Sequence, residues 1–268
     1  MNTLMVASVL GMAGLAVLFA AVLAFADKRL KLEEDPAVDK ISHLLPGVNC
    51  GACGYLSCHD FAEHIVKEGA DPRKCRAISN DIREELFKIT GGAGGTVYPR
   101  IALVHCAAES KDKKPLAEYK GVMTCRAADL VFGAGMQCVY GCIGFGDCAA
   151  ACPFGALTMV KGLPRVDPEK CTGCGKCVQA CPRGIISIRE KRYEKLFYVA
   201  CSSHDDILRV KQICAVGCIG CGICAKLSRK GFFEVSDNLS LPDYSKQEDQ
   251  ETVRGLAGKC PTKVIKEI

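Results

Sequence analysis

The stretch Cys171-Thr-Gly-Cys174-Gly-Lys-Cys177-Val-Gln-Ala-Cys181-Pro182 decides the fold of this chain, because it spaces four cysteines as C-x2-C-x2-C-x3-C-P. Thiolates at this spacing hold an iron-sulfur cluster, whereas disulfides require no such regular run. The chain has 20 cysteines among its 268 residues, and most of them fall into similar tight runs. The sequence therefore predicts a protein that carries electrons on several clusters.

The composition favours small modules folded around metal over one large apolar core. Aromatic residues make up only 6% of the chain and tryptophan is absent. Small cysteine-rich domains compensate for a thin core because the free energy of metal binding becomes folding free energy. The formal net charge of +5 arises from 35 basic and 30 acidic residues without a long basic run. Nucleic acid is therefore not an expected partner.

One membrane-spanning helix is predicted at the N-terminus. Residues 4–26 carry no charge, and as a helix they would span about 35 Å, more than the roughly 30 Å of a hydrocarbon core. A cleaved signal peptide is the alternative, since residues 24–26 resemble a cleavage site, but no basic residue precedes the apolar stretch. Lys28, Arg29 and Lys31 follow it. The positive-inside rule then predicts a single-pass protein of the cell (inner) membrane with its C-terminal domains on the cytoplasmic side.

The predicted fold class is α+β, with one N-terminal transmembrane helix, a small helical 4Fe-4S module and tandem ferredoxin-like modules. The repeat is visible in Cys138-Val-Tyr-Gly-Cys142-Ile-Gly and Cys214-Ala-Val-Gly-Cys218-Ile-Gly, which match 76 residues apart. The expected segments are a transmembrane anchor (1–26), a juxtamembrane connector (27–45), a 4Fe-4S module (46–90), a glycine-rich linker (91–99), a two-cluster ferredoxin-like module (100–195) and a one-cluster ferredoxin-like module (196–268).

The first cysteine set follows the membrane helix and consists of Cys50, Cys53, Cys58 and Cys75. Glycines between these residues let the backbone wrap closely and aim amide groups at sulfur. We predict a 4Fe-4S cluster here. A structural zinc ion is the alternative, because four cysteines also suit its tetrahedral geometry.

Two clusters are predicted in the central module, because the fourth cysteine of each run in a two-cluster ferredoxin ligates the other cluster. Phe145 stands where the preceding run would have its middle cysteine, so Cys138 is predicted to supply the missing thiolate. The two predicted sets are Cys138, Cys142, Cys148 and Cys181, and Cys152, Cys171, Cys174 and Cys177.

The last module is predicted to hold one cluster. Ser228 stands where a cysteine serving a second cluster would be, and residues 229–259 contain no cysteine run to receive it. The predicted ligands are Cys218, Cys221, Cys224 and Cys260. Four cysteines remain in comparable places of the two repeats and form a candidate fifth site, with buried free thiols as the alternative. They are Cys106, Cys125, Cys201 and Cys214.

No complete active site is predicted in the chain itself. Gly92, Gly94 and Gly95 lack the G-x-G-x-x-G spacing, and neither a Walker-type lysine loop nor a Ser-His-Asp arrangement can be picked out. We therefore expect no flavin or NAD site in this chain.

The order of motifs resembles the B subunit of the Rnf complex, the membrane ferredoxin:NAD+ oxidoreductase. The resemblance covers nearly the whole chain, and it is most specific in Leu45-Pro-Gly-Val-Asn-Cys50-Gly-Ala-Cys53-Gly-Tyr55 and in residues 138–182. It implies a subunit of an ion-translocating oxidoreductase that takes electrons from soluble ferredoxin and passes them to the other Rnf complex subunits. Flavin, NAD+ and ion translocation would belong to those subunits. The third module departs from the family, whose long members have a second full ferredoxin pair there.

Two other functions fit the motifs. The chain could carry electrons for a different membrane redox enzyme, or it could be a membrane-tethered redox sensor, although a sensor needs only one labile site. Soluble ferredoxins are typically acidic, so we predict that a group of lysines forms a surface on which ferredoxin docks. The alternative is that these lysines lie in a solvated loop without a partner role. This group is Lys111, Lys113, Lys114 and Lys120.

Overall fold

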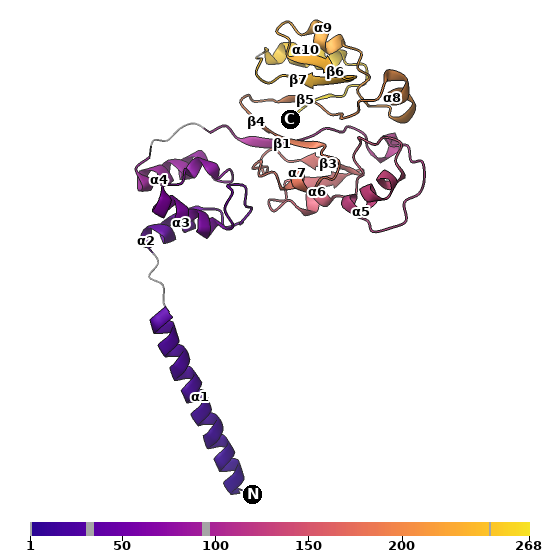
Figure 1. The fold of residues 1–268 in the computed structure, drawn as a ribbon. Coiled ribbons are helices and arrows are strands. Elements are labelled where there is room, and N and C mark those ends of the chain that lie inside the picture. The colour runs from indigo at the N-terminus through magenta and orange to yellow at the C-terminus, as the bar shows by residue number, and fades with distance from the viewer. Residues whose placement is uncertain (1, 31–34, 93–96, 247) are drawn as a thin grey trace.

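The computed structural model describes residues 2–30, 35–92, 97–246 and 248–268. Helix α1 (Asn2–Leu30) precedes a small helical module and two α+β modules (Figure 1). Its segment Met5–Arg29 is long and apolar enough to cross a membrane, and its most apolar window is not buried against the rest of the chain. The predicted anchor is thus a continuous helix. Lys31 and residues 93–96 of the predicted linker lie outside the described residues.

The helical module is built from short helices that begin on side-chain caps. These helices are α2 (Pro36–Leu44), α3 (Cys58–Glu68), η1 (Pro72–Lys74) and α4 (Asn80–Thr90). Asp35, Ser57, Asp71 and Ser79 each accept a hydrogen bond from a backbone N–H of the first turn. A small apolar core, with Ile41, Phe61 and Leu86 at its centre, packs the helices together.

The central module pairs its first strand with its last around an inner hairpin. Its main elements are β1 (Arg100–Val104), α6 (Asp147–Ala150), β2 (Leu157–Val160), β3 (Leu163–Val166), α7 (Lys176–Ala180) and β4 (Ile186–Glu190). Strand β1 runs antiparallel to β4, and β2 runs antiparallel to β3. A long insertion between β1 and α6 contains η2 (Ser110–Asp112), α5 (Cys125–Leu130) and η3 (Phe132–Gly135).

The C-terminal module repeats this arrangement. Its elements are β5 (Phe197–Val199), α8 (Ile207–Ile213), α9 (Ile223–Leu227), β6 (Phe233–Ser236), β7 (Leu239–Pro242), α10 (Gln250–Lys259) and β8 (Ile265–Glu267). Strand β5 pairs with β8, and β6 pairs with β7, both antiparallel. The duplication seen in the sequence is therefore also a duplication of strand pairing. Helix α10 stands in place of the second cysteine run and the short helix α7.

The two α+β modules pack directly on each other. His105, just after β1, lies between them: its Nδ1 is 2.8 Å from the carbonyl oxygen of Val199, and its Nε2 is 2.7 Å from Oγ of Ser187. Burial lowers the pKa of His105, which suits a neutral ring that donates through Nδ1. Buried Ile101 and Leu103 of β1 pack against Leu196 of the C-terminal module. The junction thus has both an apolar core and a specific polar contact.

Two glycines of the cysteine runs are required by close backbone approach. A Cβ added at Gly173 (φ +66°) would lie 2.4 Å from an atom of β1, and one at Gly220 (φ +59°) would lie 2.7 Å from the carbonyl oxygen of Asn238. The next glycine of each run, Gly175 or Gly222, also has a positive φ but no atom within 4 Å of such a Cβ. The first glycine of each run therefore carries a steric requirement that the second lacks.

Gly173→Ala is expected to destabilise the central module more than Gly175→Ala does. Both substitutions force alanine into the left-handed region at a cost of about 1 kcal/mol, but only Gly173→Ala must also displace β1. Thermal unfolding and iron content of the two reconstituted variants measure the difference. Equal losses in both variants would contradict the close-contact explanation.

Candidate iron-sulfur sites

The first predicted set, Cys50, Cys53, Cys58 and Cys75, comes together in the helical module. Burial raises the pKa of the Cys75 thiol, and the charges of the other three cysteines raise it further. Asn49 accepts a 2.7 Å hydrogen bond from the N–H of Cys58. The buried Arg83 donates to the carbonyl oxygen of Cys75 at 3.4 Å. Local hydrogen bonds thus hold both ends of the set.

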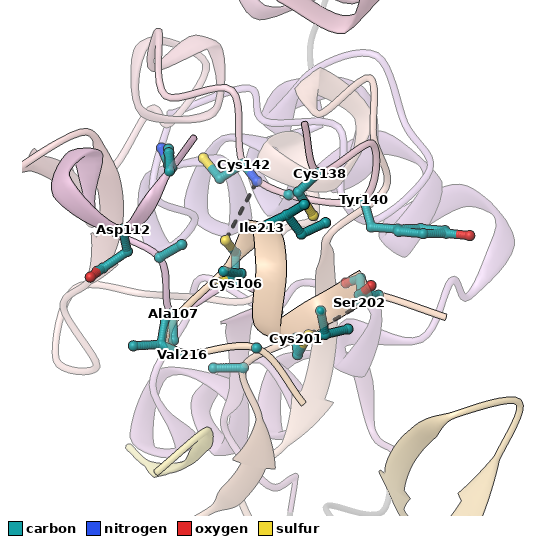
Figure 2. A pocket seen from close by; sticks show the side chains of 18 of the residues that line it. Cys106, Ala107, Asp112, Cys138, Tyr140, Cys142, Cys201, Ser202, Ile213 and Val216 are labelled. Atoms are coloured by element: carbon teal, nitrogen blue, oxygen red, sulfur yellow. Dashed lines mark hydrogen bonds between the residues drawn. The ribbon is translucent and has the colours of Figure 1, made fainter. Parts of the chain in front are cut away.

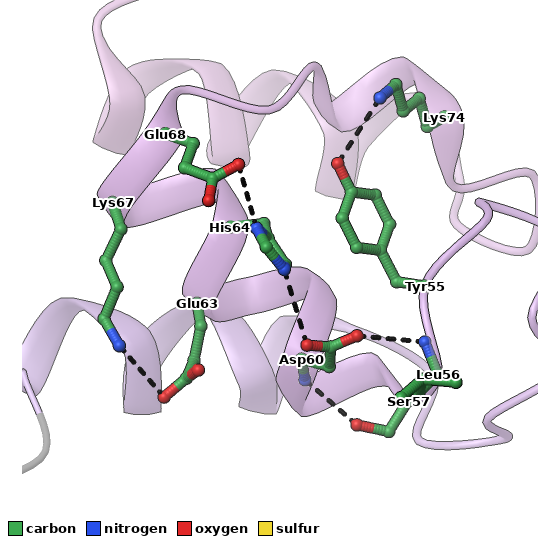
Figure 3. Close-up of polar contacts among 9 residues, drawn as sticks. All are labelled: Tyr55, Leu56, Ser57, Asp60, Glu63, His64, Lys67, Glu68 and Lys74. Atoms are coloured by element: carbon green, nitrogen blue, oxygen red, sulfur yellow. Dashed lines mark hydrogen bonds and ion pairs between the residues drawn. The ribbon is translucent and has the colours of Figure 1, made fainter.

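The loop between Cys53 and Cys58 is fixed by polar contacts to α3 and η1 (Figure 3). The N–H of Leu56 donates to the carboxylate of Asp60 at 2.9 Å, and Lys74 donates to the hydroxyl of Tyr55 at 3.4 Å. His64 lies 3.5 Å from Asp60 and 3.0 Å from Glu68. These carboxylates, rather than a metal, are the partners of His64. The contacts leave Leu56 at the tip of the loop, 91% exposed.

The second run of the central module gathers with Cys152 as predicted. Burial is the main cause that raises the pKa of the Cys177 thiol to about 12, followed by charges that include those of Cys171, Cys174 and Cys152. Main-chain N–H groups of Ala102 and Ala156 each donate to a sulfur of this set, Cys171 and Cys152, at 3.4 Å. Such bonds favour the thiolate form that binds iron.

A second cavity of the central module is lined by a set of cysteines that differs from the predicted set in one residue. Its wall carries four cysteines, and Cys125 takes the place predicted for Cys138: the set is Cys125, Cys142, Cys148 and Cys181. Burial raises the pKa of the Cys148 thiol to about 11, with further contributions from Cys125 and Cys181. The carboxylate of Asp147 accepts from the N–H of Cys125 at 2.9 Å and so holds the start of α5 beside the cavity.

Phe145, at the position of the expected middle cysteine, packs on Tyr119 of the insertion with ring centroids 5.8 Å apart. The same insertion contributes Cys125. The thiol missing from the run is thus replaced from the insertion between β1 and α6.

A third cavity lies where the two α+β modules meet (Figure 2). It brings together three of the four cysteines predicted for a fifth site, but with Cys138 instead of Cys125: the set is Cys106, Cys138, Cys201 and Cys214. The N–H of Cys142 donates to the sulfur of Cys106 at 3.5 Å. The two cavities therefore group Cys125 and Cys138 the other way round from the sequence prediction.

The C-terminal module has the predicted set around one cavity, Cys218, Cys221, Cys224 and Cys260. Ser228 occupies the position of Cys152 in the repeat. Its Oγ accepts from the N–H of Phe232 at 2.7 Å, as the sulfur of Cys152 accepts from the N–H of Ala156. Helix α10 fills the place of a second cysteine run, and the described residues of this module bring together a single four-cysteine set.

Comparisons with known proteins identify two iron-sulfur segments and relatives that align with nearly the whole chain. A family model described as a putative Fe-S cluster matches residues 45–77, and one described as a 4Fe-4S binding domain matches residues 164–187. The B subunit of the proton-translocating ferredoxin:NAD(+) oxidoreductase complex of Clostridium ljungdahlii is 38% identical, over 100% of this chain and 94% of its own length. The B subunit of the ion-translocating oxidoreductase complex of Methanosarcina acetivorans is 34% identical over 99% of each chain. The B subunit of the Na(+)-translocating ferredoxin:NAD(+) oxidoreductase complex of Acetobacterium woodii is 37% identical over 96% of this chain and 75% of its own length.

The chain belongs to this family of B subunits. The resemblance inferred from the order of motifs is confirmed, and so are the fold class and the assignment as an iron-sulfur subunit of an oxidoreductase.

The donor sets of this B subunit fit 4Fe-4S clusters. All 20 cysteines are free thiols, and three of the sets line cavities instead of converging on one point. In the part of the chain that the structure describes, no three His, Cys, Asp or Glu side chains are placed to hold a single metal ion. A cluster supplies reversible one-electron transfer at a potential set by hydrogen bonds, charge and solvent exposure.

The internal repeat contains a signal that groups Cys138 as the cavities do. Cys138 and Cys214 are equivalent in the aligned heptapeptides, and each folds its sulfur against the following glycine. A Cβ added at Gly141 would lie 3.3 Å from the sulfur of Cys138, and one at Gly217 would lie 3.6 Å from that of Cys214. If Cys214 belongs to the junction site, the repeat places Cys138 there too.

A buried arginine organises the insertion of the central module. The guanidinium of Arg183 forms an ion pair with Asp129 at 2.9 Å and donates to the carbonyl oxygens of Gly133, Cys138 and Gly141 at 2.8 to 2.9 Å. Its side chain is only 6% exposed. Arg183 follows directly after Cys181-Pro182, so it joins the insertion to the second cysteine run.

Arg183→Met is expected to lower the free energy of opening of the insertion by about 3 kcal/mol, because buried acceptors lose their charged donor. Hydrogen exchange of the main-chain amides in residues 129–141 measures this change. Arg192→Met is the control: its ion pair with Glu190 is exposed and contributes about 1 kcal/mol or less. If exchange in 129–141 were the same in both variants, Arg183 would not organise this segment.

Proposed function

We propose that this B subunit accepts electrons from reduced ferredoxin and relays them through 4Fe-4S clusters to partner subunits of an ion-translocating ferredoxin:NAD+ oxidoreductase. Its relatives carry this complex in their names. The observation that carries the proposal is the contiguous series of four-cysteine sets in one chain. Four sets are proposed as cluster ligands with the membership described above, and a fifth is argued below.

The sets lie close enough to one another to form a relay. Cys50 of the helical module is among the charges that raise the pKa of the Cys174 thiol, after burial as the main cause. Cys148 similarly lies among the charges around Cys177. The helical module thus adjoins the second run of the central module, and that run adjoins the cavity of Cys125. The positions of the thiols support electron transfer from one set to the next.

The chain is membrane-associated through α1, and we propose that it crosses the membrane once. Lys28 and Arg29 at the end of α1 favour the cytoplasmic side for all later modules. On that side they would meet soluble ferredoxin and the partner subunits.

The predicted lysine docking face receives little support. Lys113 donates to the carbonyl oxygen of Gly162, and Lys114 donates to that of Gln212, both at 2.6 Å. These two lysines tie parts of the fold together. We therefore do not assign the ferredoxin surface to this group.

Family membership favours this function over a carrier for another membrane enzyme and over a redox sensor. The relatives align with nearly the whole chain, and their names describe subunits of ion-translocating oxidoreductases.

Cys177→Ala in the intact complex tests the relay. Because this buried thiol belongs to an inner set, ferredoxin-dependent NAD+ reduction is expected to fall by roughly tenfold or more once the relay is interrupted. NADH oxidation with an artificial acceptor is the control, since it reports on the partner subunits alone and should persist. An unchanged ferredoxin-dependent rate in a complex that has lost this cluster would show that electrons bypass the chain.

A further inference from the structure

We propose that the junction of the two α+β modules holds a fifth 4Fe-4S cluster. Its ligands are Cys106, Cys138, Cys201 and Cys214. The role that we give this cluster rests on the proposed function, but its existence does not.

Each module contributes two of the four thiols. Cys106 follows β1 and Cys138 follows η3 in the central module, whereas Cys201 follows β5 and Cys214 ends α8 in the C-terminal module. The cavity between them measures about 40 Å³, against about 20 Å³ at each of the cavities of Cys125 and of the C-terminal set. The junction therefore offers no less room than the sites already assigned to clusters.

The pairing follows the internal repeat. Cys106 and Cys201 both come shortly after the first strand of their module, and Cys138 and Cys214 both turn back onto a glycine. Equivalent residues of the two repeats thus line the same cavity at the junction. A 4Fe-4S cluster has four equivalent irons, so it suits two pairs of equivalent cysteines from the two repeats.

Cys142 also lines the junction cavity, but its thiol belongs to the neighbouring set. Figure 2 shows its backbone nitrogen, and not its sulfur, directed at Cys106. Burial raises the pKa of the Cys142 thiol to about 12. The charges that raise it further come from Cys106 of the junction set and then from Cys148 and Cys125. Both line the neighbouring cavity together with Cys142.

Thiols of the same set are among the charges that raise the pKa values of the junction cysteines. Burial is the main cause that raises the pKa of Cys214, and both Cys106 and Cys138 raise it further. Cys106 also contributes to the raised pKa values of Cys138 and Cys201. Cys106 therefore lies near the three other thiols.

Packed free thiols account less well for this region. Free cysteines in a core behave as small apolar side chains, and protein interiors leave few voids. Here the four thiols surround a cavity, and main-chain N–H groups point at two of the sulfurs: Ser203 donates to Cys201 at 3.4 Å and Cys142 donates to Cys106 at 3.5 Å. N–H groups directed at sulfur are a means of stabilising cluster ligands.

The position of this site gives the series an order. Through Cys142 the junction set touches the set of Cys125. Cys218 lies beside Cys201, because its charge is among the causes, after burial, that raise the pKa of the Cys201 thiol. The junction set therefore connects the central module to the single set of the C-terminal module. Named by one cysteine each, the sets follow one another in the order Cys50, Cys171, Cys125, Cys106 and Cys218. The fifth cluster, at the set of Cys106, connects the two α+β modules.

Metal and acid-labile sulfide analysis of the reconstituted full-length protein tests the proposal without any variant. We expect about twenty irons per chain, at four per cluster. About sixteen irons, or sixteen irons together with one zinc, would overturn it. If the protein contained about twenty irons but did not accept electrons from reduced ferredoxin, the fifth cluster would stand and the proposed function would be wrong. The two proposals can therefore fail independently.

Alanine variants test the membership of the site. Cys138→Ala and Cys201→Ala are each expected to remove about four irons and to abolish the same paramagnetic resonance signal of the reduced protein. Cys125→Ala and Cys181→Ala serve as the matched pair and should abolish a different signal. If Cys138→Ala removed the same signal as Cys181→Ala, the assignment of Cys138 to the junction would be wrong. Should a variant fail to fold, the iron count of the unmodified protein still decides whether the fifth cluster exists.

Discussion

Coordination of iron by groups of four thiolates is the interaction on which this structure depends. Each module has only a small apolar core of buried residues, and several cysteines belong to these cores. In such domains the free energy of metal binding is also folding free energy. The requirement that four sulfurs surround one cluster then explains the glycines of the runs, where Gly173 and Gly220 let the backbone pass against a neighbouring segment.

The two α+β modules show how one fold can carry different numbers of cysteine runs. Both pair their first strand with their last and enclose a hairpin. In the second copy, helix α10 stands where the first copy has its second cysteine run, and the hydroxyl of Ser228 takes over the hydrogen bond made by the sulfur of Cys152. The same strand pairing therefore forms without the second cysteine run, because a helix and a hydroxyl supply the packing and the hydrogen bond that the run supplies in the first copy.

The junction joins the structural and electronic roles of the modules. His105 fixes it by contacts to Val199 and Ser187, and the adjacent Cys106 is one of the thiols directed into the shared cavity. With a cluster in this cavity, the contact that holds the modules in register would also carry electrons between them. Separating the modules would then break the fold and the relay together.

The sequence by itself determined the cysteine runs, the membrane helix, the repeat and the family, because each depends on local spacing or local apolarity. Within a run such as Cys171 to Cys177, a few residues of backbone leave the thiols only one shared site. Cys125 and Cys138 belong to no such run, and the cost of closing a loop changes only slowly with its length, so spacing could not decide which cavity each one lines. The tertiary structure decided it: Asp147 holds the start of α5, with Cys125, at one cavity, and Arg183 holds the segment of Cys138 at the edge of the other.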